Sequence, residues 1–270
     1  MFKQKYYLLT LVVVLIIIYS IINVYSAEIN SKNIKTADDL TLTYIYENIN
    51  QAIMIYEDIY DNNPDNYELC WKLSRAYNAI LDIKTNQAII TVEGLTDTEE
   101  NKKLWREFGK NSFFFSEKAL EFNPDGVEGL IWNAISYAYY SSSYGIVKAI
   151  FSGAAKKFKK NAKLLIDNAP EQMGALGYRH MGIFYLAAPF PIGSASKAAK
   201  YMQKALSLDS KYLQNHYYFG LALYRLEKYK DAKREFDYVI QNPPQVYEKH
   251  CNEAFMEESK RFIELIKRKK

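Results

Sequence analysis

The chain has 270 residues, of which 49% are hydrophobic, 15% aromatic and 24% charged, with 11 Gly, 7 Pro and a formal net charge of +4. This composition is apolar enough to build a core and too poor in Gly and Pro for a disordered or low-complexity chain. It also argues against an all-β fold with frequent tight turns, so we expect an all-α protein.

The two cysteines, Cys70 and Cys251, are too few for a disulfide framework. Neither has a second Cys or a His at metal-ligand spacing. A single bridge between them stays open, but small apolar fillers are the favoured interpretation. We expect no metal site.

Residues 1–26 have the organisation of a secretory leader. Lys3 and Lys5 precede an uncharged apolar run from Tyr6 to Ile22, as in a signal peptide, and residues 24–26 offer a cleavage site before residue 27. Because the run is also close to the length of an uncleaved anchor, both alternatives stay open. Either predicts an exported body in the periplasm or at the extracytoplasmic face, soluble or anchored by residues 6–22.

The body beyond residue 26 is nearly neutral, with 33 basic residues against 31 acidic ones. A chain without a strong basic balance is a poor binder of nucleic acid. We therefore expect no nucleic-acid partner.

After a polar linker at 27–37, residues 38–270 are expected to form one domain of helix pairs. Apolar residues at three-to-four spacing predict a first helix from Asp38 to Tyr60, with Asp38 as its N-terminal cap. This helix ends at the turn signal Asn62-Asn63-Pro64. Similar endings recur at 121–126, 167–170, 208–211 and 242–244, and periodic endings of this kind indicate repeats.

The clearest repeat runs from Leu213 to Val246, and its 34 residues are the period of a tetratricopeptide repeat. Phe219 and Gly220 form the large-small pair of its first helix. Small residues let two helices cross closely, while large ones fill the groove between them. The second half has the matching small, aromatic and helix-breaking residues Ala232, Phe236 and Pro244.

Three earlier pairs have the same pattern with insertions between their helices. The first insertion is the turn at 189–193. The second is a stretch of about ten residues that follows Tyr139, and the third is a longer segment between Tyr77 and Ser112. Irregular pairs stack less uniformly than a plain solenoid. We therefore predict a tetratricopeptide-like array of about ten helices in irregular pairs, curled around a central cleft.

Four features together resemble the T-component family that accompanies TRAP transporters in bacteria. They are the leader, the helix at 132–139, the segment at 170–185, and the Ala-Ala-Pro-Phe-Pro-Ile-Gly turn at 187–193 that leads into 198–201. The resemblance covers residues 39–242 and implies a periplasmic helical protein that binds partner proteins or a ligand, with no catalytic residues. Members are commonly lipoproteins, whereas this chain has no Cys near residue 20.

Catalytic motifs are absent from the sequence. There is no Gly-x-Ser-x-Gly, no glycine-rich nucleotide or phosphate loop and no His-Glu-x-x-His. His180, His216 and His250 are scattered, and surface or core histidines are the favoured interpretation. We expect a protein that is not an enzyme and has no cofactor.

Residues 148–163 contain six lysines and no acid. Lys156, Lys160 and Lys163 share one helix face, and Phe158 lies on the opposite, apolar face. A core-facing helix with a solvated basic side is the favoured interpretation. The alternative is contact with anionic lipid or an acidic partner.

Tyrosine is unusually frequent, with 24 residues. Codon bias would account for the number, but the placement is informative, because first helices of repeat pairs line the concave face of an array. Tyr139 and Tyr185 occupy packing positions. The candidates for a groove that binds a partner are Tyr140, Tyr144, Tyr178, Arg179 and Tyr217.

Two functional hypotheses follow from these observations. The first is an exported, non-enzymatic scaffold that binds a partner protein, specifically the solute-binding component of a TRAP-type transporter. The alternative is a periplasmic carrier that holds a hydrophobic or amphiphilic small ligand in its central cleft. Membrane contact is expected through the N-terminal segment.

Overall fold

The computed structural model describes residues 15–16, 20, 28–85, 89–145, 148–149 and 153–269, so most of the predicted leader lies outside the described residues. Residues 28–41 are helical. Among the described residues, no helix combines the length and apolar character needed to cross a bilayer. The further helices are α2 (Tyr46–Asn62), α3 (Tyr67–Thr85), α4 (Glu99–Phe122), α5 (Val127–Ser142), α7 (Ala154–Asn168), α8 (Gln172–Ala187), α9 (Ala195–Leu208), α10 (Leu213–Arg225), α11 (Tyr229–Gln241) and α12 (Asn252–Lys267).

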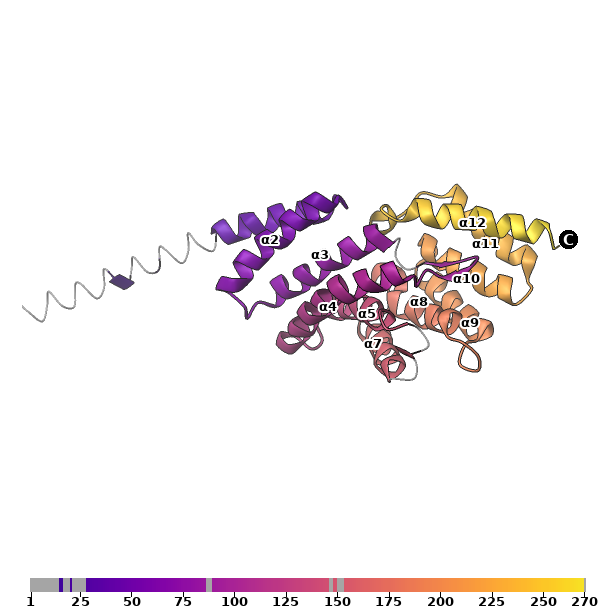
Figure 1. Ribbon diagram of the computed structural model, residues 1–270, viewed down its shortest axis with the longest axis horizontal. Helices are drawn as coiled ribbons and strands as arrows, with labels where there is room; N and C mark the ends of the chain where they lie inside the picture. Colours follow the sequence, from indigo (N-terminus) through magenta and orange to yellow (C-terminus); the bar gives the residue numbers. More distant parts are fainter. Residues whose placement is uncertain are drawn as a thin grey trace, which may run out of the picture.

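Helices that follow one another in the chain pack against one another, which gives a continuous array of helix pairs (Figure 1). The array curls, because the indigo N-terminal helices and the yellow α12 lie along the same edge of the body in Figure 1. The predicted all-α helical-repeat fold is therefore confirmed.

The close crossings predicted inside the last two repeats are present. A methyl group on Gly220 of α10 would lie 3.0 Å from the ring of Phe236 on α11. A methyl group on Gly182 of α8 would lie 2.4 Å from the terminal carbon of Met202 on α9. Both helix pairs therefore depend on a small residue that faces a large buried one.

The earlier crossings use serine instead of glycine. The hydroxyls of Ser74 on α3 and Ser112 on α4 lie 3.1 Å apart, and those of Ser116 on α4 and Ser136 on α5 lie 3.0 Å apart. All four side chains are fully buried. Hydrogen bonding between them lets small polar residues occupy a helix crossing without an unsatisfied hydroxyl.

The insertion between α3 and α4 contains a short antiparallel hairpin that the sequence analysis did not predict. Its strands are β1 (Ile90–Thr91) and β2 (Gly94–Leu95), with Ile90 opposite Leu95 and Thr91 opposite Gly94. In Figure 1 this purple hairpin lies among the orange and yellow helices of the other end of the chain. It therefore connects the first part of the array to the last.

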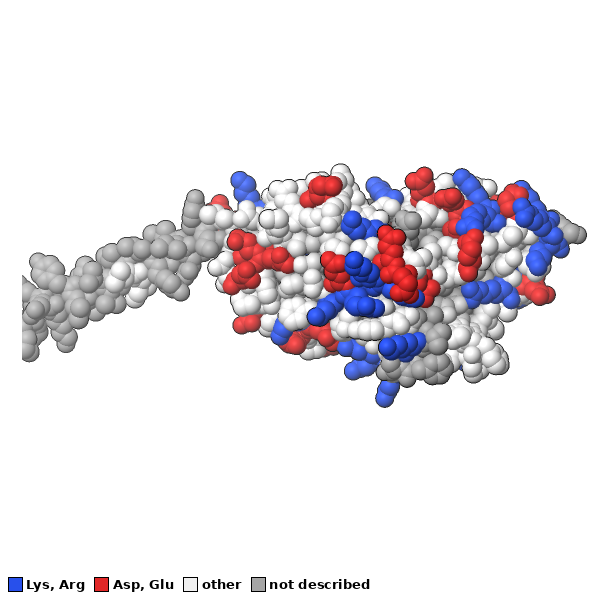
Figure 2. Space-filling view, in the orientation of Figure 1, with Lys and Arg blue, Asp and Glu red and all other residues white. Residues whose placement is uncertain are grey.

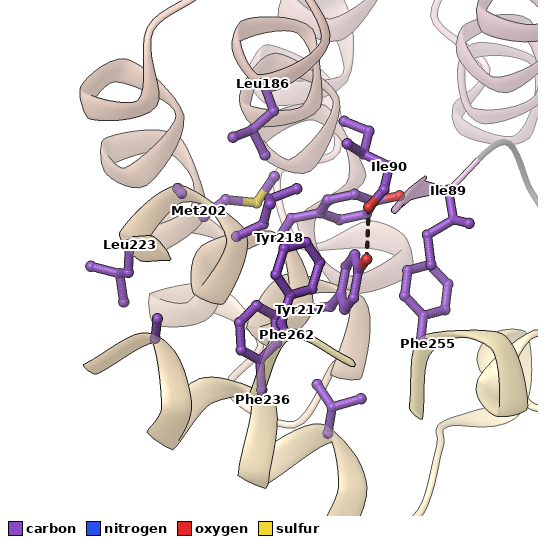
Figure 3. Packing of buried hydrophobic residues seen from close by; sticks show 14 of the residues in the cluster. Ile89, Ile90, Leu186, Met202, Tyr217, Tyr218, Leu223, Phe236, Phe255 and Phe262 are labelled. Carbon is purple, nitrogen blue, oxygen red and sulfur yellow. Dashed lines mark hydrogen bonds between the residues drawn. The ribbon is translucent and has the colours of Figure 1, made fainter. Parts of the chain in front are cut away.

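Ile89 and Ile90 belong to the same buried cluster as residues of α10, α11 and α12 (Figure 3). The hydroxyl of Tyr217 donates a hydrogen bond to the carbonyl oxygen of Ile90, 2.7 Å away. The backbone N–H of Val92 donates to Glu258 on α12 at 3.1 Å. These contacts, together with an ion pair between Glu93 and Arg261, close the curled array into one body.

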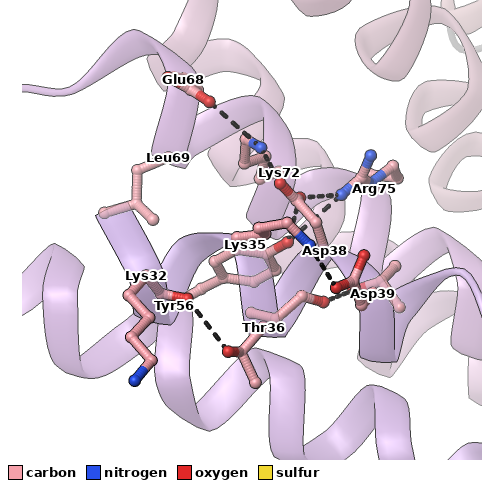
Figure 4. Close-up of polar contacts among 12 residues, drawn as sticks. Lys32, Lys35, Thr36, Asp38, Asp39, Tyr56, Glu68, Leu69, Lys72 and Arg75 are labelled. Carbon is pink, nitrogen blue, oxygen red and sulfur yellow. Dashed lines mark hydrogen bonds and ion pairs between the residues drawn. The ribbon is translucent and has the colours of Figure 1, made fainter. Parts of the chain in front are cut away.

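The linker predicted at 27–37 is wrong, since residues 28–41 form a helix and Ala37 is fully buried. Asp38 does not cap a helix. Its carboxylate accepts hydrogen bonds from Tyr56, at 2.6 Å, and from Lys72 and Arg75 of α3 (Figure 4). The segment is polar in sequence because its charges face solvent or α3, and a polar stretch of this kind is hard to distinguish from a linker.

The single helix predicted from Asp38 to Tyr60 is interrupted. A turn at 42–45 separates the helix at 28–41 from α2, and Tyr44 within it has a left-handed φ of 51°. Leu42 and Ile45, which fitted the apolar spacing, are 48% and 51% exposed. The spacing alone could not reveal that these residues belong to a turn.

Cys70 and Cys251 are buried and free, so no bridge joins them. Burial raises the pKa of the Cys70 thiol to about 11. A buried, protonated thiol is unreactive. Both residues therefore behave as the small apolar fillers that the sequence favoured.

Surface charges of both signs are interspersed over most of the face drawn in Figure 2. Several form local pairs along one helix, such as Lys102 with Glu99 at 3.0 Å and Lys233 with Asp237 at 2.6 Å. The lower edge of this view differs, because lysines gather there over α7.

Candidate binding cavity

A cavity occupies the inside of the curled array, with an empty volume of about 1110 Å³ that includes part of the open solvent at its mouth. Its walls come mainly from α5, α8 and α10. Its position agrees with the central cleft expected from the irregular repeats. Aromatic side chains from many parts of the chain line it: Tyr44, Trp132, Tyr139, Phe158, Phe184, Tyr212, Tyr218 and Tyr247.

A small polar group lies within this aromatic lining. The hydroxyl of Tyr139 donates a hydrogen bond to Asp82, and His250 Nε2 lies 3.4 Å from the other carboxylate oxygen of Asp82. Burial and the nearby Asp82 raise the pKa of Tyr139 well above its usual range. Tyr139 is therefore a neutral hydrogen-bond donor at physiological pH.

The start of α8 forms part of the wall in an unusual conformation. Met173, Gly174 and Ala175 have left-handed φ values of 47°, 64° and 57°. The Nη1 atom of Arg179 donates to the carbonyl oxygens of Met173 and Gly174, both at 2.8 Å, and its guanidinium lies 4.5 Å from the ring centroid of Tyr212. Arg179 is only 3% exposed, so it holds this turn from inside the protein.

His180 follows Arg179 on the cavity wall and stacks on Phe158, with ring centroids 5.4 Å apart. Burial, assisted by the positive charge of Arg179, lowers the pKa of His180 to about 3. The imidazole is therefore neutral throughout the physiological range and contributes an aromatic surface to the cavity rather than a charge.

The cavity mouth carries exposed apolar side chains. Tyr44 stacks on His250 at a centroid distance of 3.8 Å, and both residues line the cavity. Leu42 and Ile45, on either side of Tyr44 in the turn, are about half exposed. Tyr247, which also lines the cavity, is 42% exposed and follows Val246, which is 64% exposed. We call Leu42, Ile45, Val246 and Tyr247 the apolar mouth, because Tyr247 lines the cavity and the other three are exposed neighbours in sequence of the lining residues Tyr44 and Tyr247.

Of the residues predicted from sequence, Arg179 lines the cavity. Tyr217 is fully buried in the cluster around Ile90 and packs against Phe255. Tyr178 is half-buried outside the lining residues.

Tyr140 and Tyr144 also lie outside the lining. Their hydroxyls are 3.0 Å apart, and Tyr140 stacks on Phe113 of α4. These two tyrosines therefore form a partly exposed pair at the end of α5, outside the cavity lining.

Sequence reasoning missed several cavity residues outside the first helices of the repeats, among them Tyr44, Leu95, Tyr212 and Tyr247. They lie in turns, in the hairpin or in the three-residue 3-10 helix Val246–Glu248, where α-helix periodicity gives no signal. Among the described residues, no group of three or more His, Cys, Asp or Glu side chains could hold a metal ion.

The fold and its internal cavity define a helical-repeat protein of the tetratricopeptide type. The structure is similar to TTC0263, a thermophilic tetratricopeptide-repeat protein of Thermus thermophilus, with a TM-score of 0.57 and 11% identity over 84% of this chain and 98% of that chain. It is also similar to MamA from Desulfovibrio magneticus RS-1, with a TM-score of 0.49 and 14% identity over 80% and 94% of the two chains. At 11% identity the similarity to TTC0263 shows the fold alone.

The family follows from a family model that matches residues 33–264. The chain belongs to the RMD1-3 family, described as regulator of microtubule dynamics protein 1-3. No curated protein matches the chain significantly. The resemblance to the T-component family stays a prediction.

Proposed function

We propose that the protein is a non-enzymatic helical-repeat scaffold that holds an apolar segment of a partner protein at its central cavity. The observation that carries this proposal is the aromatic cavity, whose lining includes half-exposed Tyr247 and whose lining residues Tyr44 and Tyr247 have the exposed apolar residues Leu42, Ile45 and Val246 beside them in the chain. Clustered exposed apolar side chains beside a pocket are typical of an interaction site.

The lining suits one or a few apolar anchors of a partner. Aromatic side chains supply most of the surface, while Asp82, Arg179 and Gln214 offer polar groups that fix an orientation. An inserted apolar side chain would displace water from this surface, and the mouth would pack around the backbone of the inserted segment. Such a division into a buried anchor and a surrounding rim is common in protein interfaces.

The identity of the partner protein and the cellular location are both proposed from the sequence. The resemblance to the T-component family favours the solute-binding component of a TRAP-type transporter as the partner, and the leader favours export. The family name refers to microtubule dynamics, and a microtubule partner would require a cytoplasmic body. A C-terminal alkaline phosphatase fusion distinguishes the two locations, because the reporter is active only after export. An inactive fusion of normal abundance would contradict export.

A second candidate function is the carriage of a hydrophobic or amphiphilic small molecule. The specific observation in its favour is the aromatic lining of the cavity, to which Trp132 belongs and in which Phe158 stacks on both neutral His180 and Phe184. Native mass spectrometry of gently extracted protein tests this candidate. A bound small molecule that is lost in an Ile183→Trp variant, in which the larger side chain fills the cavity, would support it; an empty wild-type protein would contradict it.

Site-specific photocrosslinking separates the two candidates. Benzoylphenylalanine placed at Tyr247 in the mouth is expected to give an adduct of protein mass in the native envelope. The matched control is Phe122 at the end of α4, an aromatic residue of similar exposure, 40% against 42%, that is not among the cavity lining. A discrete protein adduct at 247 and none at 122 supports the scaffold, whereas a small-molecule adduct alone at 247 supports the carrier. Equal adducts at both positions would contradict both.

A further inference from the structure

The turn between α8 and α9 projects an aromatic side chain into solvent. Phe190 is 94% exposed, although Ala188 before it and Ile192 after it are packed. Ile192 N–H and Gly193 N–H both donate to the carbonyl of Pro189, at 3.0 and 2.9 Å, and Ser194 N–H donates to the carbonyl of Tyr185 at 2.9 Å. These hydrogen bonds fix the turn, so Phe190 protrudes from a well-defined loop.

Gly193 makes this turn possible. A methyl group at this position would lie 2.1 Å from the carbonyl oxygen of Ala188, so only glycine permits the close return of the chain. Exposing a large aromatic side chain on an ordered turn has no benefit for folding, because Phe190 would gain from burial. Phe190 is therefore free to contact a surface outside the chain.

The start of α7 and this turn pack against the same two buried residues. Ala155 and Phe158 of α7 contact a buried cluster of Phe184 and Ala188, and so does Ile192 of the turn. The exposed side of α7 carries Lys156, Lys159 and Lys160, and that of α9 carries Lys197 and Lys200. Lysines from two helices therefore flank the base of the turn that presents Phe190.

Two aromatic residues of α8 bring the two groups of lysines together. Lys159 Nζ lies 5.4 Å from the ring centroid of Phe184, and Lys197 Nζ lies 5.3 Å from that of Tyr185. The two rings are themselves 5.3 Å apart. Lys159 and Lys197 thus lie over adjacent aromatic rings, although they are far apart in sequence.

These lysines are not neutralised locally. Within the described part of the chain, Lys157 pairs with Glu117 and Lys163 with Asp167, whereas Lys156, Lys159, Lys160, Lys197 and Lys200 have no acid at ion-pair distance. Neither α7 nor α9 has an acidic residue in its first turn, although acids there would favour helix formation. Figure 2 shows the lysines of α7 at the lower edge of the body.

We infer that this surface, formed by Phe190, Lys156, Lys159, Lys160, Lys197 and Lys200, docks the body on an anionic lipid bilayer. The lysines complement the negative surface of such a bilayer, and Phe190 has the size and exposure to enter the interface between headgroups and acyl chains. A solvated basic helix would explain the lysines alone but not the protruding aromatic residue between them. The site is separate from the cavity mouth and does not depend on the proposed scaffold function.

The test uses the full chain with a probe at position 190. Residues 6–22 could insert into vesicles on their own, so vesicle binding of the whole chain would not show whether the body docks. The Phe190→Cys variant is labelled at position 190 with an environment-sensitive fluorophore. The native Cys70 and Cys251 do not react with the label because they are buried. We expect a blue shift on vesicles that contain phosphatidylserine and none on pure phosphatidylcholine vesicles. The shift should weaken as the salt concentration rises. A label at Met54, which is 70% exposed on α2, is the control and should not respond.

A charge variant separates docking from general charge effects. Combined Lys156→Gln, Lys159→Gln and Lys160→Gln should raise the phosphatidylserine vesicle concentration needed for half of the shift by more than about tenfold. Combined Lys228→Gln, Lys230→Gln and Lys260→Gln removes the same charge at other exposed positions and should change it less than about threefold. Circular dichroism confirms that both variants fold. No shift on anionic vesicles, an equal shift on neutral ones, or an equal shift with soluble polyglutamate would overturn the inference.

Discussion

The hydroxyl of Tyr217 and the carbonyl oxygen of Ile90 form a buried hydrogen bond of 2.7 Å between residues 127 positions apart in the chain. The bond joins the hairpin of the first half of the array to α10 in the second half. It is one of the contacts between the hairpin and the last helices that close the array, together with those of Val92 and Glu93.

Tyr217→Phe should destabilise the protein by about 1 to 3 kcal/mol, because it leaves the buried carbonyl of Ile90 without its donor while the ring packing is kept. Denaturant unfolding of the purified protein measures the change. Tyr178→Phe removes a hydroxyl from a half-buried tyrosine and should cost less than about 0.5 kcal/mol. An equal loss of unfolding free energy for the two substitutions would show that the hydrogen bond to Ile90 stabilises the protein no more than the hydroxyl of a half-buried tyrosine does.

Gly174→Ala should destabilise the protein by about 2 to 4 kcal/mol, since it adds strain at a left-handed residue and brings a methyl group into the ring of Tyr212, 2.2 Å away. Gly153→Ala is the control. Gly153 is also left-handed, with a φ of 86°, but a methyl group there meets nothing within 4 Å, so only the backbone cost of about 1 kcal/mol is expected. Thermal or denaturant unfolding compares the two, and a larger cost at Gly153 would contradict the packing described for α8.

Asp38→Asn should cost about 2 to 4 kcal/mol at pH 7, because Lys72 and Arg75 lose their shared carboxylate. Burial alone would raise the pKa of Asp38, but the hydrogen bonds from Lys72 and Tyr56 and the charge of Arg75 outweigh it and lower the pKa. The stabilisation is therefore present above the unfolded pKa of about 3.9 and is lost as the pH falls through the lower folded value.

The difference in unfolding free energy between wild type and Asp38→Asn should accordingly shrink below about pH 4. Asp39→Asn makes the same change one residue away, where the pair with Lys35 is mostly exposed. It should cost less than about 0.5 kcal/mol at any pH. If the difference in unfolding free energy between wild type and Asp38→Asn stayed constant down to pH 2, this would contradict the ionic role of the Asp38 carboxylate.

The stability of the protein should also fall between about pH 6.5 and pH 3 because of His180. The folded pKa is lowered to about 3, so the unfolded chain takes up a proton on His180 in this window and the folded chain does not. The slope from this residue is at most about 1.4 kcal/mol per pH unit. His180→Phe keeps an aromatic ring beside Phe158 and should remove that slope, which unfolding at a series of pH values measures. An unchanged slope would mean that His180 is protonated in the folded protein.

The repeat crossings could be predicted from sequence because each depends on residues close together in the chain. Gly220 and Phe236 are 16 positions apart within one helix pair, and the structure places them in contact. Spacing rules capture such pairs because helix geometry alone brings the two residues together.

The closure of the array could not be predicted in this way. Strands β1 and β2 have two residues each, too few to give an alternating pattern. Tyr217 lies on a first helix, where groove residues were expected, but the distant Ile90 decides that it is a core residue. The left-handed turn at 173–175 had Gly174 as its only local signal, since Met173 and Ala175 normally avoid this conformation.

The most direct test of the binding cavity combines the photocrosslinker at Tyr247 with the cavity-filling substitution Ile183→Trp. The account predicts a discrete adduct in the wild-type background and a loss of most of it in the filled variant, with native far-ultraviolet circular dichroism in both. An adduct of undiminished yield in the folded, filled variant would contradict the claim that the cavity is the binding site.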